Sequence, residues 1–417
     1  MPNRRNAVYI LLILTLLTGL FTGRAFFFNL AYMLAGLMVI SLIWSWLSVR
    51  GISIRRKTRS SRAQVGRTLE EEFMVRNTGI LPKLWIEVID ESDLPGHRAS
   101  QIVPALNVRG GHRWQVRTYC TSRGEFRLGP MTFTSGDPFG LFTSQRHLAA
   151  TSQILVYPQI VQINRFDLPT GLLSGGEAQR RRSHYVTTNA AGVRDYVFGD
   201  SFNRIHWPSS ARKNRLIVKE FEIDPLVDIW LFADFSRDSL VEDPAIQRVD
   251  GTGPIIPTSS GIPPSSEEYV AVVAASLTRY FINLDRTLGF AAYTPAREIH
   301  QPERGNRQLT RVLETLAVAR STSHYTLGQM LTLETPYFTR GTTLIIITAS
   351  NNKEWIREAQ LLGQRGIRVM CIFVDPGSFN SQINADNTIG LLRVGKVPTI
   401  VVRNGDDLGA VLTERSF

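Results

Sequence analysis

The chain has 417 residues, a length that allows two or three domains and a sizeable core. Its formal net charge of +11 would suggest a nucleic-acid-binding protein, but residues 1–69 hold ten basic and no acidic side chains, which leaves 37 basic against 36 acidic residues elsewhere. The excess charge therefore belongs to the N-terminal segment, and its position argues against a nucleic-acid-binding face.

Residues 6–23 and 25–49 are two uncharged apolar runs separated only by Arg24. Each is long enough to span the ~30 Å hydrocarbon core of a bilayer as a helix. Because basic residues flank the outer end of each run, residues 1–50 are predicted to form a transmembrane hairpin with both ends and the soluble bulk in the cytoplasm. The protein would then be a multi-pass inner-membrane protein. The alternative for the first run is a cleaved signal peptide, although no clear cleavage site precedes the second run.

Residues 51–65 are rich in arginine and are predicted to be a juxtamembrane linker, either against anionic headgroups or merely solvated. From residue 66 to 165, short β-like runs alternate with Gly- and Pro-containing turns, which predicts a small antiparallel sandwich. The expected strands are 69–76, 84–89, 112–120 and 131–134. The two cysteines, Cys120 and Cys371, are far apart and lie in apolar or β-like surroundings, so we expect buried, inert thiols.

Residues 166–224 are predicted to be a linker followed by a motif-rich segment, 192–222. In this segment polar anchors alternate with apolar residues, and a Gly-Asp turn divides it. The residues that define the motif are Gly192, Arg194, Tyr196, Gly199, Asp200, Arg204, Trp207, Ala211, Arg212 and Glu220. Such a segment is either a site or a structural clasp, because paired charges can be buried only where their hydrogen bonds are met. His206 is the best single candidate for acid–base catalysis, and a structurally locked histidine is the alternative.

From residue 225 to 417 the pattern changes to alternating strands and helices, with an insertion at 242–266 whose Pro, Gly and Ser content predicts flexibility. The expected strands are 226–233, 288–293, 343–348, 367–374 and 399–402, and the expected helices are 267–283, 306–320, 353–364 and 406–412. Continuous apolar strands between amphipathic helices predict a doubly wound, mostly parallel α/β sheet. Ligands of such sheets bind at the carboxyl ends of the strands.

Asp234, Ser236 and Asp238 alternate along the loop after the first of these strands. The loop resembles the Asp-x-Ser-x-Ser metal site of von Willebrand factor type A domains, with Asp238 in place of the second serine. Oxygen ligands at alternate positions can converge on Mg²⁺, which prefers octahedral oxygen coordination. Those domains supply a further aspartate after a later strand, where this chain has Thr348, Ala349 and Ser350. A Mg²⁺ site and a degenerate loop retained for the fold both remain open.

The motif at 192–222, with its Gly-Asp turn, its Arg-Ile-His-Trp run at 204–207 and its Ser-Ala-Arg run, resembles the signature of the bacterial "domain of unknown function 58" family. A second stretch, 122–142 with a Tyr-Pro pair at 157–158, is similar to the same family. The resemblance implies a membrane-anchored protein with a von Willebrand A-like C-terminal domain. It also implies a chaperone-like partnership with a MoxR-type AAA+ ATPase.

Two classes of function follow. The first is a non-enzymatic, membrane-anchored scaffold that presents its α/β domain to a cytoplasmic protein. The second is a hydrolase at the membrane, which would use His206 with Asp200 or a metal at Asp234. The first predicts partner capture without turnover, and the second predicts a concave pocket that joins the motif segment to the Asp234 loop.

Overall fold

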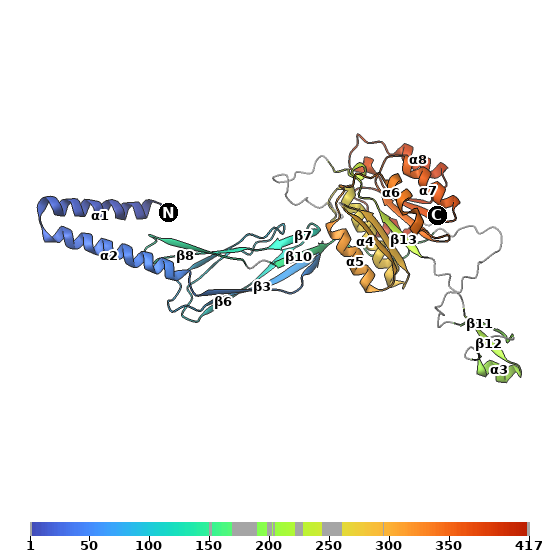
Figure 1. Ribbon diagram of the computed structural model, residues 1–417, viewed down its shortest axis with the longest axis horizontal. Coiled ribbons are helices and arrows are strands. Elements are labelled where there is room, and N and C mark those ends of the chain that lie inside the picture. Colours follow the sequence, from blue (N-terminus) through green and yellow to red (C-terminus); the bar gives the residue numbers. More distant parts are fainter. Residues whose placement is uncertain are drawn as a thin grey trace. The chain divides into compact units, whose positions relative to one another are not determined.

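A computed structural model describes residues 2–149, 152–168, 190–197, 202, 205–221, 228–243, 261–294 and 296–414. These residues form two compact units, the first built mainly of residues 1–159 and the second mainly of the remainder. Figure 1 shows the elements of each unit. The predicted insertion at 242–266 falls mostly outside the described residues, which omit 244–260.

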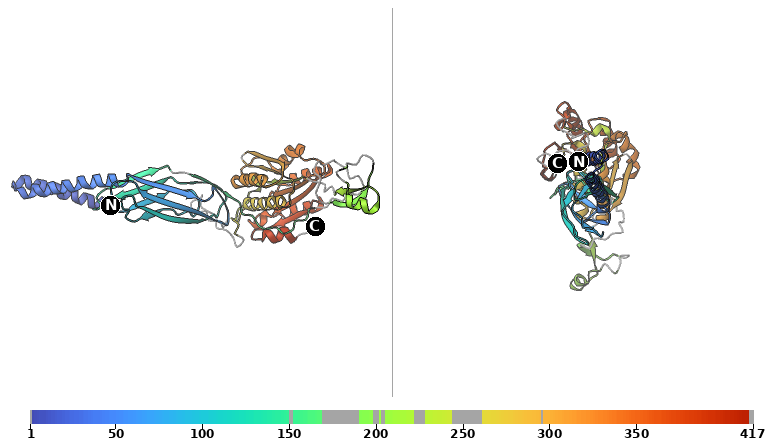
Figure 2. Two further views of the ribbon diagram at one scale, coloured as in Figure 1. Left: turned by 90° about the horizontal axis from the view of Figure 1, so that it is seen from below. Right: turned by 90° about the vertical axis from the view of Figure 1, so that its left-hand side faces the viewer.

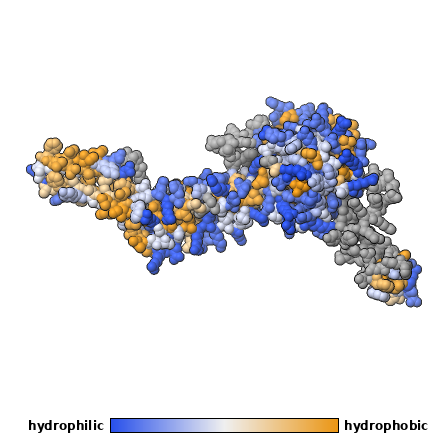
Figure 3. Space-filling model, in the orientation of Figure 1, coloured by the Kyte–Doolittle hydropathy of each residue, from blue (hydrophilic) through white to orange (hydrophobic). Residues whose placement is uncertain are grey.

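Two helices open the chain, α1 (Pro2–Thr22) and α2 (Ala25–Ser48). Their mean hydropathies of 1.6 and 2.1 make both apolar enough to cross a membrane. At 1.5 Å per residue the 24-residue α2 is about 36 Å long, which exceeds a ~30 Å hydrocarbon core. On the face that Figure 3 shows, most of the hairpin is hydrophobic. The two predicted apolar helices are confirmed; a signal sequence would meet the same criteria of length and composition.

The rest of the first unit is built mainly of antiparallel strand pairs, and only β2 and β10 pair in parallel among the described strands of this unit. One three-stranded sheet has the order β1-β3-β6, and a four-stranded sheet has the order β5-β4-β8-β9. Their shared core includes Phe73 and Val75 from β3 and Ile86 and Val88 from β4, so the two sheets form a sandwich. The strands are β1 (Ile52–Thr58), β3 (Thr68–Asn77), β4 (Ile86–Asp90), β5 (Gln101–Val103), β6 (Gly111–Tyr119), β8 (Met131–Gly136) and β9 (Thr143–Leu148).

A second small sheet, of order β2-β10-β7, completes this unit. Its strands are β2 (Arg62–Gln64), β7 (Gly124–Leu128) and β10 (Ser152–Tyr157). The structure therefore corrects the predicted linker at 51–65, most of which forms β1 and β2. Three consecutive basic residues, 55–57, hid the strand pattern of β1, and the middle one, Arg56, has a buried side chain rather than one turned toward headgroups.

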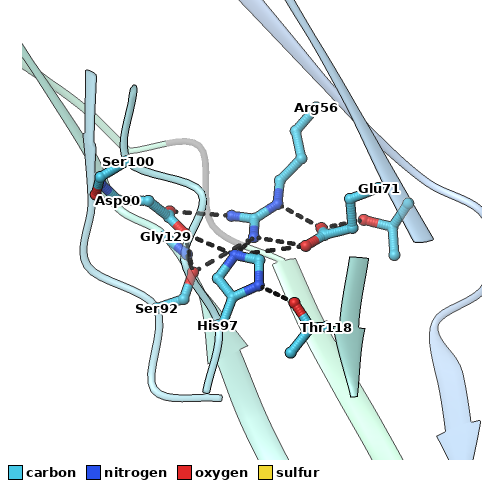
Figure 4. A network of polar contacts seen from close by, with 9 residues as sticks. Arg56, Glu71, Asp90, Ser92, His97, Ser100, Thr118 and Gly129 are labelled. Carbon is cyan, nitrogen blue, oxygen red and sulfur yellow. Dashed lines mark hydrogen bonds and ion pairs between the residues drawn. The ribbon is translucent and has the colours of Figure 1, made fainter. Parts of the chain in front are cut away.

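Arg56 lies in a buried polar network between the two sheets (Figure 4). Its Nε donates to Oε1 of Glu71 at 2.8 Å, and Nη1 donates to Oδ1 of Asp90 at 3.3 Å. Nε2 of His97 lies 2.9 Å from Oδ2 of Asp90, which also accepts a hydrogen bond from Ser92. Burial opposes ionisation of Asp90, but the hydrogen bonds from His97 and Ser92 and the charge of Arg56 outweigh it and lower the pKa of Asp90. The network thus compensates the charges that the sandwich encloses.

A buried lysine joins the sandwich to α2. Nζ of Lys83 donates to the carbonyl oxygens of Leu47 at 2.7 Å and Arg50 at 2.8 Å. The last carbonyls of a helix have no partner within the helix, so Lys83 satisfies the end of α2 and adds a favourable charge there. Burial lowers the pKa of Lys83. A second link, between Oγ of Ser45 on α2 and Oγ of Ser144 on β9, measures 2.9 Å.

The second unit contains a six-stranded sheet of order β15-β14-β13-β16-β17-β18. All neighbouring pairs are parallel except β14 and β15. The strands are β13 (Ile229–Ala233), β14 (Leu288–Tyr293), β15 (Arg297–Glu303), β16 (Thr343–Thr348), β17 (Arg368–Val374) and β18 (Thr399–Val402). The mixed helix-and-sheet body predicted for this region is confirmed. The antiparallel edge strand β15 was not predicted.

Helices lie on both faces of this sheet (Figure 2). On one face α6 and α7 share a core with Trp230 and Phe232, and α4 contacts β13, β14, β16 and β17. The helices are α4 (Ser266–Asn283), α5 (Asn306–Val318), α6 (Leu327–Glu334), α7 (Glu354–Gln364), α8 (Asp386–Val394) and α9 (Leu408–Glu414). Cys371 on β17 and Cys120 in the sandwich are both buried free thiols, as expected.

Candidate binding site at the carboxyl edge of the sheet

The strand order of the sheet reverses between β13 and β16. Counted along the chain from β13, the order is 3-2-1-4-5-6. In sheets of this order, ligands bind at the carboxyl ends of the two strands where the order reverses, here β13 and β16. Asp234 directly follows β13, and Thr348 ends β16. The structure therefore brings the predicted metal loop to the position where sheets of this type bind ligands.

At this point Asp234 is fully enclosed. Its Oδ2 accepts a hydrogen bond from Oγ1 of Thr348 at 2.6 Å, and its Oδ1 accepts one from the backbone N–H of Ser236 at 2.9 Å. Burial raises the pKa of the Asp234 carboxyl, and the hydrogen bonds from Thr348 and Ser236 act in the opposite direction. Thr348 thus holds Asp234 by a direct hydrogen bond.

The loop of residues 319–326, between α5 and α6, runs beside the Asp234 loop. Ser236 and Ser323 form an isolated parallel bridge, in which the N–H of Arg237 donates to the carbonyl of Ser323 at 3.1 Å. The sequence pattern did not indicate this neighbour, because Ser323 lies 87 positions after Ser236 and neither serine lies in a periodic element. The structure adds Thr322 and Ser323 to the oxygen-bearing groups near Ser236.

A pocket of about 730 Å³ opens between these loops and the end of β14. Its lining includes Arg237, Tyr293, Arg297, Ser323, His324 and Tyr325. Arg237 is exposed and forms no ion pair with another described residue, so it contributes an uncompensated positive charge. The combination of arginine with tyrosine faces suits a partner that offers a carboxylate next to apolar surface.

The far wall of this pocket is braced by Glu334, a buried carboxylate at the end of α6. Nε and Nη2 of Arg297 donate to its two oxygens at 2.7 and 2.9 Å, and the hydroxyl of Tyr293 also donates to it. Burial and the hydrogen bond to Glu334 raise the pKa of Tyr293 to about 12. Because Glu334 neutralises Arg297, the free charge of the pocket comes mainly from Arg237.

Of the three predicted Mg²⁺ ligands, Asp234 and Ser236 are buried and Asp238 is exposed. Oγ of Ser236 is buried and has no hydrogen-bond partner, which suits an oxygen reserved for a ligand. Each carboxylate oxygen of Asp234 already accepts a hydrogen bond. The described residues contain no group of three or more His, Cys, Asp or Glu side chains that could hold a metal. A Mg²⁺ site at Asp234, Ser236 and Asp238 therefore stays a prediction.

The motif segment contains a two-stranded sheet, in which β11 (Ala190–Asp195) pairs antiparallel with β12 (Ile217–Phe221), and α3 (Trp207–Lys213) lies between them in sequence. Gly192 stands opposite Glu220, and Arg194 opposite Val218. The N–H of Tyr196 donates to the carbonyl of Leu216. Trp207, Ala211 and Arg212 lie on α3 and are exposed. Gly199, Asp200 and Arg204 of the motif lie outside the described residues.

His206 begins α3 as its N-cap. Nδ1 lies 2.7 Å from Oγ of Ser209 and accepts a hydrogen bond from the backbone N–H of Ser209 at 3.3 Å. Ser210, one position further along, donates to the carbonyl of His206 and accepts from the N–H of Ile217, which ties α3 to β12. This geometry agrees with a structural role for His206, since capping satisfies the first N–H groups of a helix.

Residues 192–243 match the model of a protein family described as "Protein of unknown function DUF58". The chain is also similar to the uncharacterized protein YeaD of Bacillus subtilis, with 30% identity over 125 residues, which cover 29% of this chain and 30% of YeaD. The chain thus spans less than a third of that relative. Both matches support the resemblance to the DUF58 family.

Similarities to solved structures are weak. The pilus adhesin SpaC from Lactobacillus rhamnosus GG aligns with a TM-score of 0.33 and 10% identity over 45% of this chain and 29% of the adhesin. The CARDB domain of PF1109 from Pyrococcus furiosus aligns with a TM-score of 0.19 and 14% identity over 25% of this chain and 86% of the domain. At these scores neither similarity bears on fold or function.

Proposed function

We propose that the protein is a membrane-anchored scaffold whose α/β domain, a von Willebrand A-like fold, captures a cytoplasmic protein at the carboxyl edge of its sheet. The observation that carries this proposal is the 730 Å³ pocket beside the carboxyl ends of β13 and β14. In this pocket Arg237 is exposed and forms no ion pair with another described residue. A carboxylate of the partner would pair with Arg237 or complete a Mg²⁺ shell at Ser236. The resemblance to the DUF58 family makes a MoxR-type AAA+ ATPase the first partner to look for.

Site-specific photocrosslinking in cells tests this proposal. A crosslinking amino acid replaces Tyr325, which lines the pocket and is 52% exposed, and in a matched variant it replaces Leu284, which is 53% exposed and precedes the amino end of β14. We expect a discrete crosslinked protein from position 325 that is absent from position 284. Equal labelling at both positions, or none at 325, would remove the pocket as the capture site.

The placement of the α/β domain has a separate test. Basic flanks at both outer ends of α1 and α2 favour a cytoplasmic location for everything that follows the hairpin. A tag added at Phe417 should therefore survive protease treatment of intact spheroplasts and be cut after lysis. Cleavage in intact spheroplasts would place the domain outside and exclude a cytoplasmic ATPase as its partner.

The alternative function, a hydrolase, makes a different prediction. Among the described residues, His206 is engaged by Ser209 at the start of α3 and has no hydrogen bond to a carboxylate. A hydrolase that uses the Asp234 loop would lose turnover in an Asp234→Asn variant, whereas a scaffold would show no turnover in either form.

A further inference from the structure

Residues 137–142, the tip of the hairpin between β8 and β9, form a braced loop outside the site described above. The carboxylate of Asp137 is buried, and its oxygens accept hydrogen bonds from the N–H groups of Phe139 at 2.9 Å and Phe142 at 2.7 Å. Leu141 is buried within the loop, but the side chain of Phe139 is 51% exposed. The loop thus holds an aromatic side chain outward on a rigid support, although burying it would be favourable.

Two contacts place this tip beside the end of the apolar hairpin. Ser144, the second residue of β9, bonds to Ser45 on α2, and Ser41, one turn earlier on α2, is also buried. On the other side, a Cβ atom on Gly140 would come within 3.8 Å of Nη1 of Arg4, near the start of α1. The tip therefore lies level with the last two turns of α2 and the first turn of α1, and β8 reaches α2 in Figure 1.

This level corresponds to the boundary of a bilayer that the hairpin would span. Because α2 is about 6 Å longer than a ~30 Å hydrocarbon core, its final turn lies where acyl chains meet headgroups. Trp46 and Arg50 agree with this assignment, since the guanidinium of Arg50 stacks on the ring of Trp46 at 3.4 Å. Tryptophan and arginine are typical anchors at that depth, and phenylalanine partitions there as well.

A neighbouring loop carries a further exposed apolar side chain at the same end of the sandwich. Ile80 is 82% exposed, and its loop is tied to the chain just after α2 by the hydrogen bond from the N–H of Thr78 to the carbonyl of Gly51. Gly51 follows α2, so Ile80 lies further from the hydrocarbon than Phe139. Phe139 and Ile80 thus lie exposed on two loops at the same end of the sandwich, and packing of the sandwich core does not account for either of them.

We propose that residues 137–142 are a membrane-contact loop, in which Phe139 inserts between lipid headgroups and acyl chains and Ile80 makes a shallower contact. The occupant of this surface is the lipid bilayer, because the surface is continuous with the apolar hairpin. The inference rests on the proposed anchoring of α1 and α2 in the membrane. It assigns a role to the stretch 122–142, the second one that is similar to the DUF58 family, because that stretch ends in this loop. The sandwich would then lie directly against the membrane rather than being held away from it by a linker.

The test uses the full-length protein in phosphatidylethanolamine and phosphatidylglycerol vesicles. An environment-sensitive fluorophore is attached to single-cysteine replacements, with the wild type, whose two cysteines are buried, as the labelling blank. The replacements are Phe139→Cys, Ile80→Cys, and Tyr119→Cys as the matched control, since Tyr119 is 56% exposed at the opposite end of β6. Val39→Cys, on the exposed surface of α2, reports insertion of the hairpin.

Lipids that carry a nitroxide near the headgroup should quench the probe at 139 several-fold more than the probe at 119, with position 80 in between. Quenching at 139 no greater than at 119, while deep nitroxides quench position 39, would overturn the membrane-contact loop and leave the anchoring intact. Loss of quenching at position 39 would overturn the anchoring and the loop contact together. A blue-shifted probe at 139 without lipid quenching would show a protein contact instead, and would also overturn the proposal.

Discussion

Thr348 donates its hydroxyl hydrogen to Asp234 across the central pair of strands, with 2.6 Å between Oγ1 and Oδ2. The N–H of Asp234 also donates to the carbonyl of Ile347, so β13 and β16 are joined beyond the end of their shared ladder. A threonine that donates to a buried carboxylate provides part of what a metal ion or a second acid–base group would otherwise supply. The carboxyl ends of β13 and β16 are therefore joined by these hydrogen bonds whether or not an ion is bound.

The first prediction concerns this hydrogen bond. Thr348→Val keeps the shape of the side chain but leaves the buried Asp234 carboxylate with one fewer donor. We expect a loss of about 1–3 kcal/mol in the free energy of unfolding, measured by thermal or urea denaturation. Thr310→Val is the control, because that hydroxyl bonds locally on the exposed face of α5. Equal effects of the two replacements would contradict the structural importance assigned to Thr348.

The second prediction concerns Mg²⁺ and Ser236. Because Oγ of Ser236 is buried without a partner, Ser236→Ala should melt at or slightly above the wild-type temperature in EDTA. If Ser236 binds Mg²⁺ with a Kd near 1 mM, 10 mM Mg²⁺ should stabilise the wild type by about 1.4 kcal/mol. That gain should be absent from the alanine variant. A wild type that melts identically in Mg²⁺ and EDTA would retire the metal site.

The third prediction concerns the lysine at the end of α2. Lys83→Met fills a similar volume but removes the charged donor from the carbonyls of Leu47 and Arg50, of which Leu47 keeps the hydrogen bond from the N–H of Arg50. We expect a loss of roughly 2–3 kcal/mol in detergent solution, since hydrogen bonds from a charged donor are among the stronger ones. Lys57→Met, at an exposed position of β1, should change stability by no more than about 0.5 kcal/mol. Increased proteolysis near Gly51 in the Lys83 variant alone would localise the effect.

The fourth prediction concerns the pH dependence of the sandwich. The pKa of Asp90 is held below its ordinary value of 3.8, so the folded state favours the ionised form. The stability that this provides is present above pH ~4 and is lost as the pH falls through the lowered pKa. Asp90→Asn should therefore be less stable than the wild type at neutral pH and should differ less from it below pH ~3. Asp93→Asn, whose ion pair with Arg127 is exposed, should follow the wild-type profile.

The local sequence pattern was sufficient to predict a strand where all of its residues are buried. The strand at 288–293 is predicted without error, because six consecutive residues of β14 are buried and none of them is charged. The same reasoning failed for β1, where arginine and lysine alternate with the inward-facing side chains. Whether Arg56 faces solvent depends on Glu71 and Asp90, which are 15 and 34 positions away. The candidate site was likewise predictable only in part. The Asp234 loop is a local pattern that the sequence shows, whereas Ser323 comes to lie beside it only through the tertiary fold.

The bond between Lys83 and the end of α2 also has a consequence for biogenesis. The end of α2 lacks the charged donor of Lys83 while the chain is being synthesised, until a residue 36 positions beyond Leu47 has emerged and the loop that carries it has docked. N-terminal segments generally fold first during translation, so the hairpin would enter the bilayer with an unfinished end. Formation of the sandwich would then complete the anchor, and a ribosome stalled before residue 83 would leave a hairpin that the membrane retains less firmly.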